Sequence, residues 1–168
     1  KLDTTAAQAS SSDYSAAAVN STAFFVSTSL IYVGELGADY VSYCFAPIQG
    51  YSKFGSYVGN GNANGPYVHC GFKPAFVLIK NVDVTQVWIM YDGKRKSFNQ
   101  DAAVNSIYAS EVSAEYTGAS YHNLDILSNG FKIRLTDASQ NGNGNTHIFM
   151  AFAENPFVTS EGSPTTAR

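Results

Sequence analysis

Short apolar runs, separated by glycine, proline and asparagine, form the main pattern along this chain. Runs of four to eight residues between turn signals are typical of strands. The pattern predicts strands at 23–33, 40–46, 53–58, 67–70, 75–80, 87–91, 124–127, 131–135 and 147–153. Short strands at a spacing of roughly 8–12 residues indicate a sandwich or a barrel.

Two segments give this prediction its strongest support. FVLIK, at Phe76–Lys80, lies between Pro74 and Asn81 and is typical of a buried strand. Leu124–Leu135 predicts a hairpin that turns at Asn129-Gly130, a dipeptide that tolerates positive φ. In its second strand apolar residues alternate with Lys132 and Arg134, so one side of that sheet faces solvent. We therefore expect an all-β, antiparallel β-sandwich of jelly-roll or lectin-like form.

Helix signals are few, and the candidate for a short helix is Ser106–Tyr116, which lacks an apolar stripe. The fold should therefore contain at most one short helix. Residues 1–21 are small, polar and rich in Ala and Ser, which predicts a linker or arm from an upstream region. Residues 22–168 should form the sandwich domain. The start at Lys1 rather than Met suggests a processed product or a fragment of a longer chain.

Composition narrows the classes of partner. Charged residues make up 14% of the chain, and the net charge is −3. The compact basic run Lys94–Lys96 is too short to follow a nucleic-acid backbone, so we expect no nucleic-acid partner. No stretch approaches the roughly 18 apolar residues of a membrane helix. Cys44 and Cys70 could be bridged or free, and both alternatives remain open.

The chain lacks recognisable catalytic patterns. The histidines His69, His122 and His147 have no zinc-like spacing, and no G-x-S-x-G elbow or phosphate loop is present. No spacing pairs two carboxylates for glycoside hydrolysis. We therefore predict that the protein is not an enzyme and has no cofactor and no metal. Trp88 alternates with Ile89 and could be a core residue or a stacking platform.

Two loops stand out because asparagine occupies every second position. Asn60–Gly65 resembles the start of a calcium loop, but its ligands would be neutral amides, and position twelve is Gly71. The second loop is Asn141–Asn145. Both loops fit turns at positive φ, and both also fit a polar surface whose amides could match sugar hydroxyls. Long loops of this kind are costly to order without a use.

Several long phrases resemble a domain near the C-terminus of bacteriophage tail-fibre-like virion proteins, particularly those of marine and cyanobacterial phages. They are Tyr40–Ala46, Tyr51–Gly61, Gly65-Pro66, Gly71–Lys80 and Met150–Phe157, and the resemblance covers about residues 32–168. The family often carries a lectin-like sandwich upstream, and residues 1–30 look like the end of such a region. The resemblance implies an extracellular location on the virion and a terminus close to Arg168.

The resemblance leaves several functions open. The first is host-surface attachment to a glycan or receptor. The alternatives are a purely structural virion subunit, in fibre assembly or capsid decoration, and a carbohydrate-binding module of a bacterial surface protein. The candidate ligand-binding residues are Asn60, Asn62, Asn64, Tyr67, Asn141, Asn143, Asn145 and Tyr121. Low charge and many tyrosines suit subunit interfaces, so we expect a homo-oligomer, a trimer by preference, with other virion proteins as partners.

Overall fold

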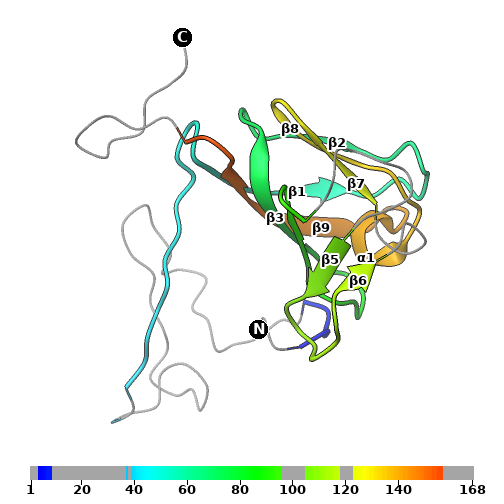
Figure 1. Ribbon diagram of the computed structural model, residues 1–168. Coiled ribbons are helices and arrows are strands. Elements are labelled where there is room, and N and C mark those ends of the chain that lie inside the picture. Colours follow the sequence, from blue (N-terminus) through cyan, green and yellow to red (C-terminus); the bar gives the residue numbers. More distant parts are fainter. Residues whose placement is uncertain (1–3, 9–36, 38, 96–104, 118–122, 157–168) are drawn as a thin grey trace. The chain divides into compact units, whose positions relative to one another are not determined.

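A computed structural model of the protein describes residues 4–8, 37, 39–95, 105–117 and 123–156. The chain divides into two compact units, one of residues 1–8 and 46–168 and one of residues 9–45. The first unit contains all the described strands and the described helix (Figure 1). No helix among the described residues is long and apolar enough to span a membrane.

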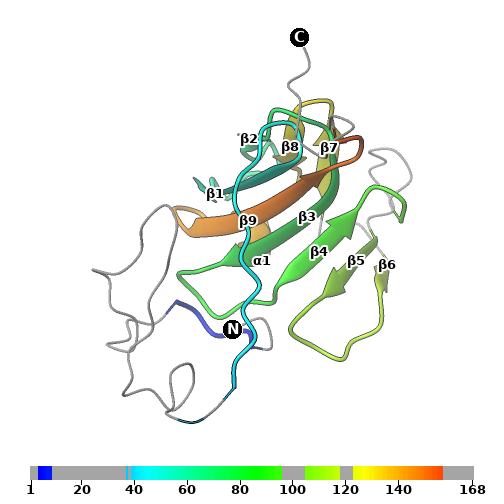
Figure 2. The ribbon, with the colours of Figure 1, turned by 90° about the vertical axis from the view of Figure 1, so that its left-hand side faces the viewer.

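The described residues of the first unit form two antiparallel sheets. The large sheet has the order β1-β9-β3-β4-β5-β6, and its strands lie side by side in Figure 2. These strands are β1 (Ser52–Val58), β3 (Pro74–Asn81), β4 (Ile89–Asp92), β5 (Asn105–Tyr108), β6 (Tyr116–Thr117) and β9 (Thr146–Ala153). The small sheet has the order β2-β8-β7, from β2 (Tyr67–His69), β7 (Leu124–Leu127) and β8 (Gly130–Ile133). One short helix, α1 (Ala138–Asn141), precedes β9.

The core lies between the two sheets. Alternate residues of β3, β4 and β9 face β2, β7 and β8, as the period of two in a strand requires. The buried apolar residues are Val68, Cys70, Phe72, Val77, Ile79, Ile89, Tyr91, Leu124, Phe131, Ile133, Phe149 and Ala151. The prediction of an all-β, antiparallel sandwich with at most one short helix is confirmed.

The positions of the elements differ from the prediction in three places. Residues 40–46 are not a strand: Val41 and Tyr43 are more than four-fifths exposed, and the segment joins no strand ladder. Alternation alone cannot make a strand, because a strand needs a hydrogen-bonded neighbour. Ser106–Tyr116 is not a helix but contains the short strands β5 and β6. The helix instead follows Asp137, whose carboxylate accepts from Ser139 N at 2.8 Å. The predicted strand 23–33 and the boundary at 21–22 lie outside the described residues.

The predicted hairpin exists, but its turn is built differently. Leu127 pairs with Gly130, so the two loop residues are Ser128 and Asn129, and Gly130 begins β8. Gly130 does not have positive φ. It is required by a close approach instead, because a Cβ there would lie 2.0 Å from the carbonyl oxygen of Val68. Phe131 and Ile133 are fully buried, and Lys132 and Arg134 are half-buried, as their alternation predicts.

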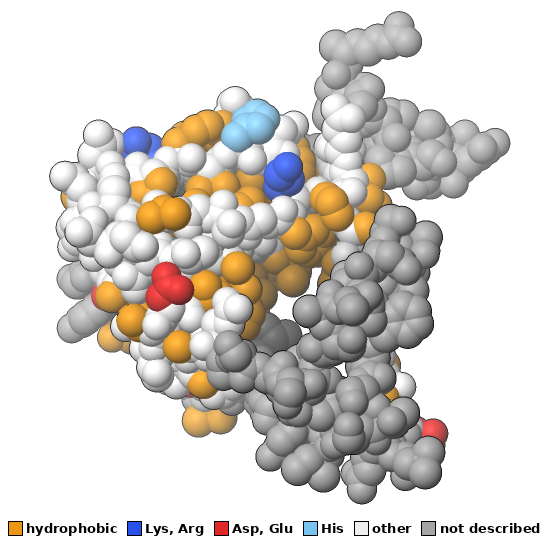
Figure 3. Space-filling view, turned by 180° about the vertical axis from the view of Figure 1, so that it is seen from behind, with side chains coloured by type: hydrophobic (Ala, Val, Ile, Leu, Met, Phe, Trp, Pro, Cys, Tyr) orange, Lys and Arg blue, Asp and Glu red, His pale blue; other side chains and the backbone are white. Residues whose placement is uncertain are grey.

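The outer face of the large sheet is also apolar. Cross-strand register places Phe54 beside Met150, Met150 beside Leu78, and Leu78 beside Met90. A groove of about 450 Å³ on this sheet is lined by Phe54, Gly55, Leu78, Trp88, Ile148, Phe149 and Met150. Figure 3 shows hydrophobic side chains gathered on one face of the molecule. Trp88 is half-buried as a wall of this groove and lies outside the core cluster.

Part of the predicted N-terminal arm packs against the sandwich. Gln8 N donates to Val82 O at 2.6 Å, and Gln86 N donates to Thr5 O at 2.9 Å. The ammonium of Lys80, a residue only 3% exposed, donates to Thr5 O at 3.1 Å and to Gln86 O at 2.8 Å. Burial lowers the pKa of Lys80. Residues 4–8 therefore belong with the sandwich, where they supply a carbonyl acceptor for a buried cation.

Candidate functional site

Strand pairing brings the two asparagine-rich loops to the same end of the large sheet. Val58, the last residue of β1, pairs with Thr146, the first residue of β9. The loop that leaves β1 and the loop that enters β9 must therefore lie next to each other. We call residues 59–65 the first loop and residues 141–145 the second loop.

Backbone hydrogen bonds join the two loops. Gly59 N donates to Asn145 O at 2.9 Å, and Gly144 N donates to Gly59 O at 2.9 Å. Gly61 N donates to Asn141 O at 3.0 Å. The approach is so close that a Cβ at Gly59 would lie 2.3 Å from the carbonyl oxygen of Gly142. The glycines are therefore needed for the contact between the loops as well as for turns.

Asn141 is the side chain that locks the loops together. It is fully buried, and its Oδ1 accepts from Asn60 N at 2.8 Å. Its Nδ2 lies 3.1 Å from Asn60 Oδ1, 2.8 Å from Asn62 O and 2.8 Å from Leu135 O. Asn141 is the last residue of α1, and the helix directs it into the first loop. This candidate ligand residue is itself buried, and its amide is taken up by bonds to the first loop and to Leu135.

The first loop caps itself. Asn60 Oδ1 accepts from Asn62 N at 3.0 Å, and Asn62 Oδ1 accepts from Asn64 N at 2.8 Å. Asn60 Nδ2 also donates to Asn64 O at 3.1 Å. Asparagine at every second position thus produces successive turns in which each side chain bonds the backbone two residues on. These bonds within the loop add to those that Asn141 makes to it.

The outward groups of the site are amides from both loops. Asn60, Asn62, Asn64 and Asn143 are exposed, and Asn145 is half-buried. The side-chain oxygens of Asn60 and Asn62 are occupied by backbone N–H groups, but the amides of Asn64 and Asn143 accept and donate no hydrogen bond among the described residues. Among those residues, no three His, Cys, Asp or Glu side chains are grouped to hold a metal ion. The arrangement offers neutral donors and acceptors on a fixed frame.

A buried polar layer supports the loops from below. Tyr57 OH donates to Gln140 O at 2.6 Å, and Tyr91 OH donates to Gln140 Oε1 at 2.6 Å. The ring of His147 stacks on Tyr57, with centroids 5.0 Å apart. Asn81 Nδ2 donates to Ala138 O at 2.7 Å. These contacts anchor α1, and hence Asn141, on β1, β3, β4 and β9.

Burial sets the ionisation of this layer. It raises the pKa of Tyr57 and of Tyr91 well above the ordinary value, so both phenols stay protonated and keep donating. His147 is fully buried, and desolvation lowers its pKa. Its Nδ1 lies 3.0 Å from Asn145 O and its Nε2 3.4 Å from Ala138 O, and these backbone bonds oppose the lowering. This layer was not predicted from the sequence. The signal was present, because His147 alternates with Phe149 and Ala151 along the strand and so shares their core-facing side.

The two candidate tyrosines have different standing. Tyr67 lies on β2 and is 44% exposed, and its hydroxyl donates to Asn129 Oδ1 at 2.7 Å. Tyr121 lies outside the described residues.

Cys44 and Cys70 are both free, the first exposed and the second buried, and burial raises the pKa of the Cys70 thiol to about 11.

Comparison with known proteins adds a family. A family model described as "Domain of unknown function (DUF7483)" matches residues 1–156. No curated protein and no solved structure matches the chain significantly.

Proposed function

The chain belongs to the DUF7483 family, whose function is not known, and we propose that it is a host-attachment module of a bacteriophage fibre or tail protein, exposed on the virion. The resemblance of phrases such as Tyr51–Gly61 and Gly71–Lys80 to tail-fibre-like proteins supports the virion location. In this proposal the module binds a glycan or receptor on the host surface, with no catalytic step and no cofactor.

The pair of locked loops is the observation that carries the binding proposal. The amides of Asn62, Asn64 and Asn143 are exposed on a frame held by the buried side chain of Asn141. An amide offers both a donor and an acceptor, which matches a sugar hydroxyl. Because the frame is already ordered, a ligand would not have to pay for ordering the loops.

A purely structural role is the second candidate, and the groove on the large sheet favours it. Its walls are apolar and adjoin one another, with Ile148 38% exposed, and a contiguous apolar patch on a surface is typical of an interaction site. Interfaces between subunits bury apolar and aromatic side chains. In this alternative the chain is a subunit of a homo-oligomer, a trimer by preference, and contacts other virion proteins.

The adsorption of the purified protein to host cells separates the two candidates. We expect the combined variant N62A/N64A/N143A to bind at least about tenfold more weakly, because each neutral hydrogen bond contributes about 0.5–1.5 kcal/mol. Asn155→Ala is the matched control, since Asn155 is also exposed but follows β9, whereas the second loop precedes it. Full adsorption by a folded triple variant would exclude these amides as the binding site, and no adsorption by the wild-type protein would favour the structural subunit.

A further inference from the structure

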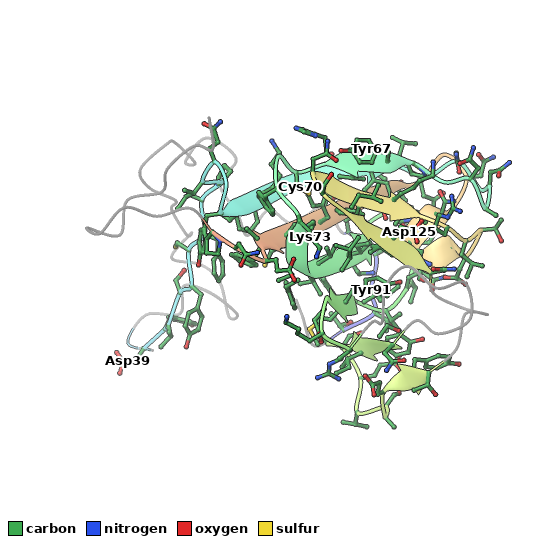
Figure 4. The ribbon with its side chains drawn as sticks, turned by 45° about the horizontal axis from the view of Figure 1, so that its top comes forward. Asp39, Tyr67, Cys70, Lys73, Tyr91 and Asp125 are labelled. Atoms are coloured by element: carbon green, nitrogen blue, oxygen red, sulfur yellow. The ribbon has the colours of Figure 1, made fainter. Side chains whose placement is uncertain are left out.

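The outward face of the small sheet carries an aromatic and charged row. Val68 is buried, so its neighbours Tyr67 and His69 point outward. In the register of the sheet Tyr67 pairs with Lys132, and Lys132 pairs with Asp125. Cross-strand neighbours have Cβ atoms roughly 4.5–5.5 Å apart, so the three side chains form one continuous strip. Figure 4 labels Tyr67 and Asp125, on the two outer strands of this sheet.

The lysine of this strip lacks its expected partner. Asp125 lies directly opposite Lys132, but its Oδ2 is held by Nε of Arg134 at 3.1 Å. Lys132 makes no ion pair within the part of the chain that the structure describes. Lys132 and Arg134 therefore share a single carboxylate, and that carboxylate is engaged by Arg134. An anion at this place would meet an available ammonium.

Next to the ammonium lies a fixed aromatic ring. Tyr67 OH donates to Asn129 Oδ1 at 2.7 Å and lies 3.3 Å from Nδ1 of His69. These contacts hold the hydroxyl, while the side chain remains 44% exposed. A ring fixed in this way presents apolar area at low entropic cost, as aromatic side chains of binding surfaces do.

We infer that this strip binds an acidic sugar, with the anionic group of the sugar at Lys132 and the C–H face of the sugar ring on the ring of Tyr67. An acidic sugar combines an apolar ring face, hydroxyls and a negative charge within the span of two neighbouring strands. The strip begins two residues after Gly65, the last residue of the first loop, so a glycan chain could extend from it onto the loop amides. The inference rests on the proposed attachment function and names the chemical class of its ligand.

A glycan array with carboxylated, sulfated and neutral oligosaccharides tests this. We expect the wild-type protein to bind acidic but not neutral sugars, and the carboxylated and sulfated sets show which acid group is preferred. K132Q should weaken binding at least tenfold, because a hydrogen bond to a charged group is worth more than a neutral one. Lys94→Gln is the control, since the Lys94 side chain is 90% exposed and lies beyond β4. Equal binding of neutral sugars, or full binding by K132Q, would overturn the inference.

A variant that is expected to strengthen binding separates an effect on the site from simple misfolding. Asp125→Asn removes a negative charge that repels an anionic ligand and releases Arg134 from its ion pair, so it should strengthen binding of acidic sugars several-fold. R134Q releases Asp125 to pair with Lys132 and should weaken the binding of acidic sugars. Unchanged or weaker binding by D125N would contradict this account of Lys132.

These experiments distinguish failure of the attachment proposal from failure of the acidic-sugar inference. If N62A/N64A/N143A loses host adsorption while K132Q and Y67A keep it, attachment stands and the acidic-sugar site does not. If the wild-type protein does not adsorb to cells and no acidic sugar is bound on the array, both are wrong.

Discussion

The first and second loops carry the same alternation of asparagine with small residues, yet their side chains are used in opposite directions. In the first loop Asn60 and Asn62 turn back onto their own backbone and leave amide groups at the surface. In the second loop Asn141 is fully buried and bonds across to the first. Asn143, two residues later, is exposed.

The difference arises from what precedes each asparagine. The first loop follows a strand directly, with no helix to orient its side chains, so the side-chain oxygens of Asn60 and Asn62 serve as local caps. Asn141 ends a short helix that is itself pinned by Tyr57, through Gln140 O, and by Asn81, through Ala138 O. The same residue type is therefore a surface group in one loop and a structural anchor in the other. A repeated pattern of asparagine does not by itself identify a binding surface.

Substituting the anchor gives the largest expected effect. Asn141→Ala leaves Asn60 N and the carbonyls of Asn62 and Leu135 without this partner. We expect a loss of about 2–4 kcal/mol in the free energy of unfolding, since a fully buried side chain and all of its bonds are lost together. Asn143→Ala, in the same loop but exposed, should stay within about 0.5 kcal/mol of wild type. Chemical denaturation measures both, and equal stabilities would remove the distinction between the two asparagines.

Local pattern predicted much of the scaffold, because side-chain alternation in a strand is a property of neighbouring residues. Phe131 and Ile133 could be assigned to the core, and Lys132 and Arg134 to the outer side, from their spacing alone. The strands β5 and β6 were missed because four and two residues are too few to show a period.

The site depends on register between distant segments, which spacing cannot reveal. Asn141 points inward only because β1 pairs with β9 and brings Asn60 beside it. Gly130 is needed because the Val68 carbonyl of β2 passes over it, and not for a turn. Asparagine could be placed in loops from the sequence, but which amide is buried required the fold.

Acid should lower the stability of the folded protein through protonation of His147, which packs beneath the second loop. Its folded pKa is lowered from 6.5, chiefly by desolvation, so the unfolded chain takes up a proton more readily. Stability from the neutral ring is therefore present above about pH 6.5, is lost as the pH falls towards the folded pKa, and changes no further below it. We expect denaturation midpoints to fall between pH 7.5 and 5.5, and to fall less in His147→Gln. His69→Gln, on the exposed side of β2, is the control, and a slope that persists unchanged in H147Q would exclude this histidine as the cause.

Smaller effects than that of Asn141→Ala should come from the two loop glycines with positive φ. Gly61 has φ +62° and a Cβ there would lie 2.9 Å from Asn143 Cβ, whereas Gly144 has φ +75° and nothing within 4 Å. Gly144→Ala should cost only the backbone penalty of about 1–2 kcal/mol, and Gly144→Asn less, because asparagine tolerates this region. Gly61→Ala should cost more than Gly144→Ala, since Asn143 must also move. Thermal denaturation compares the stabilities of the three variants. If Gly144→Ala were less stable than Gly61→Ala, the tip of the second loop would be more tightly packed than the contact between the two loops.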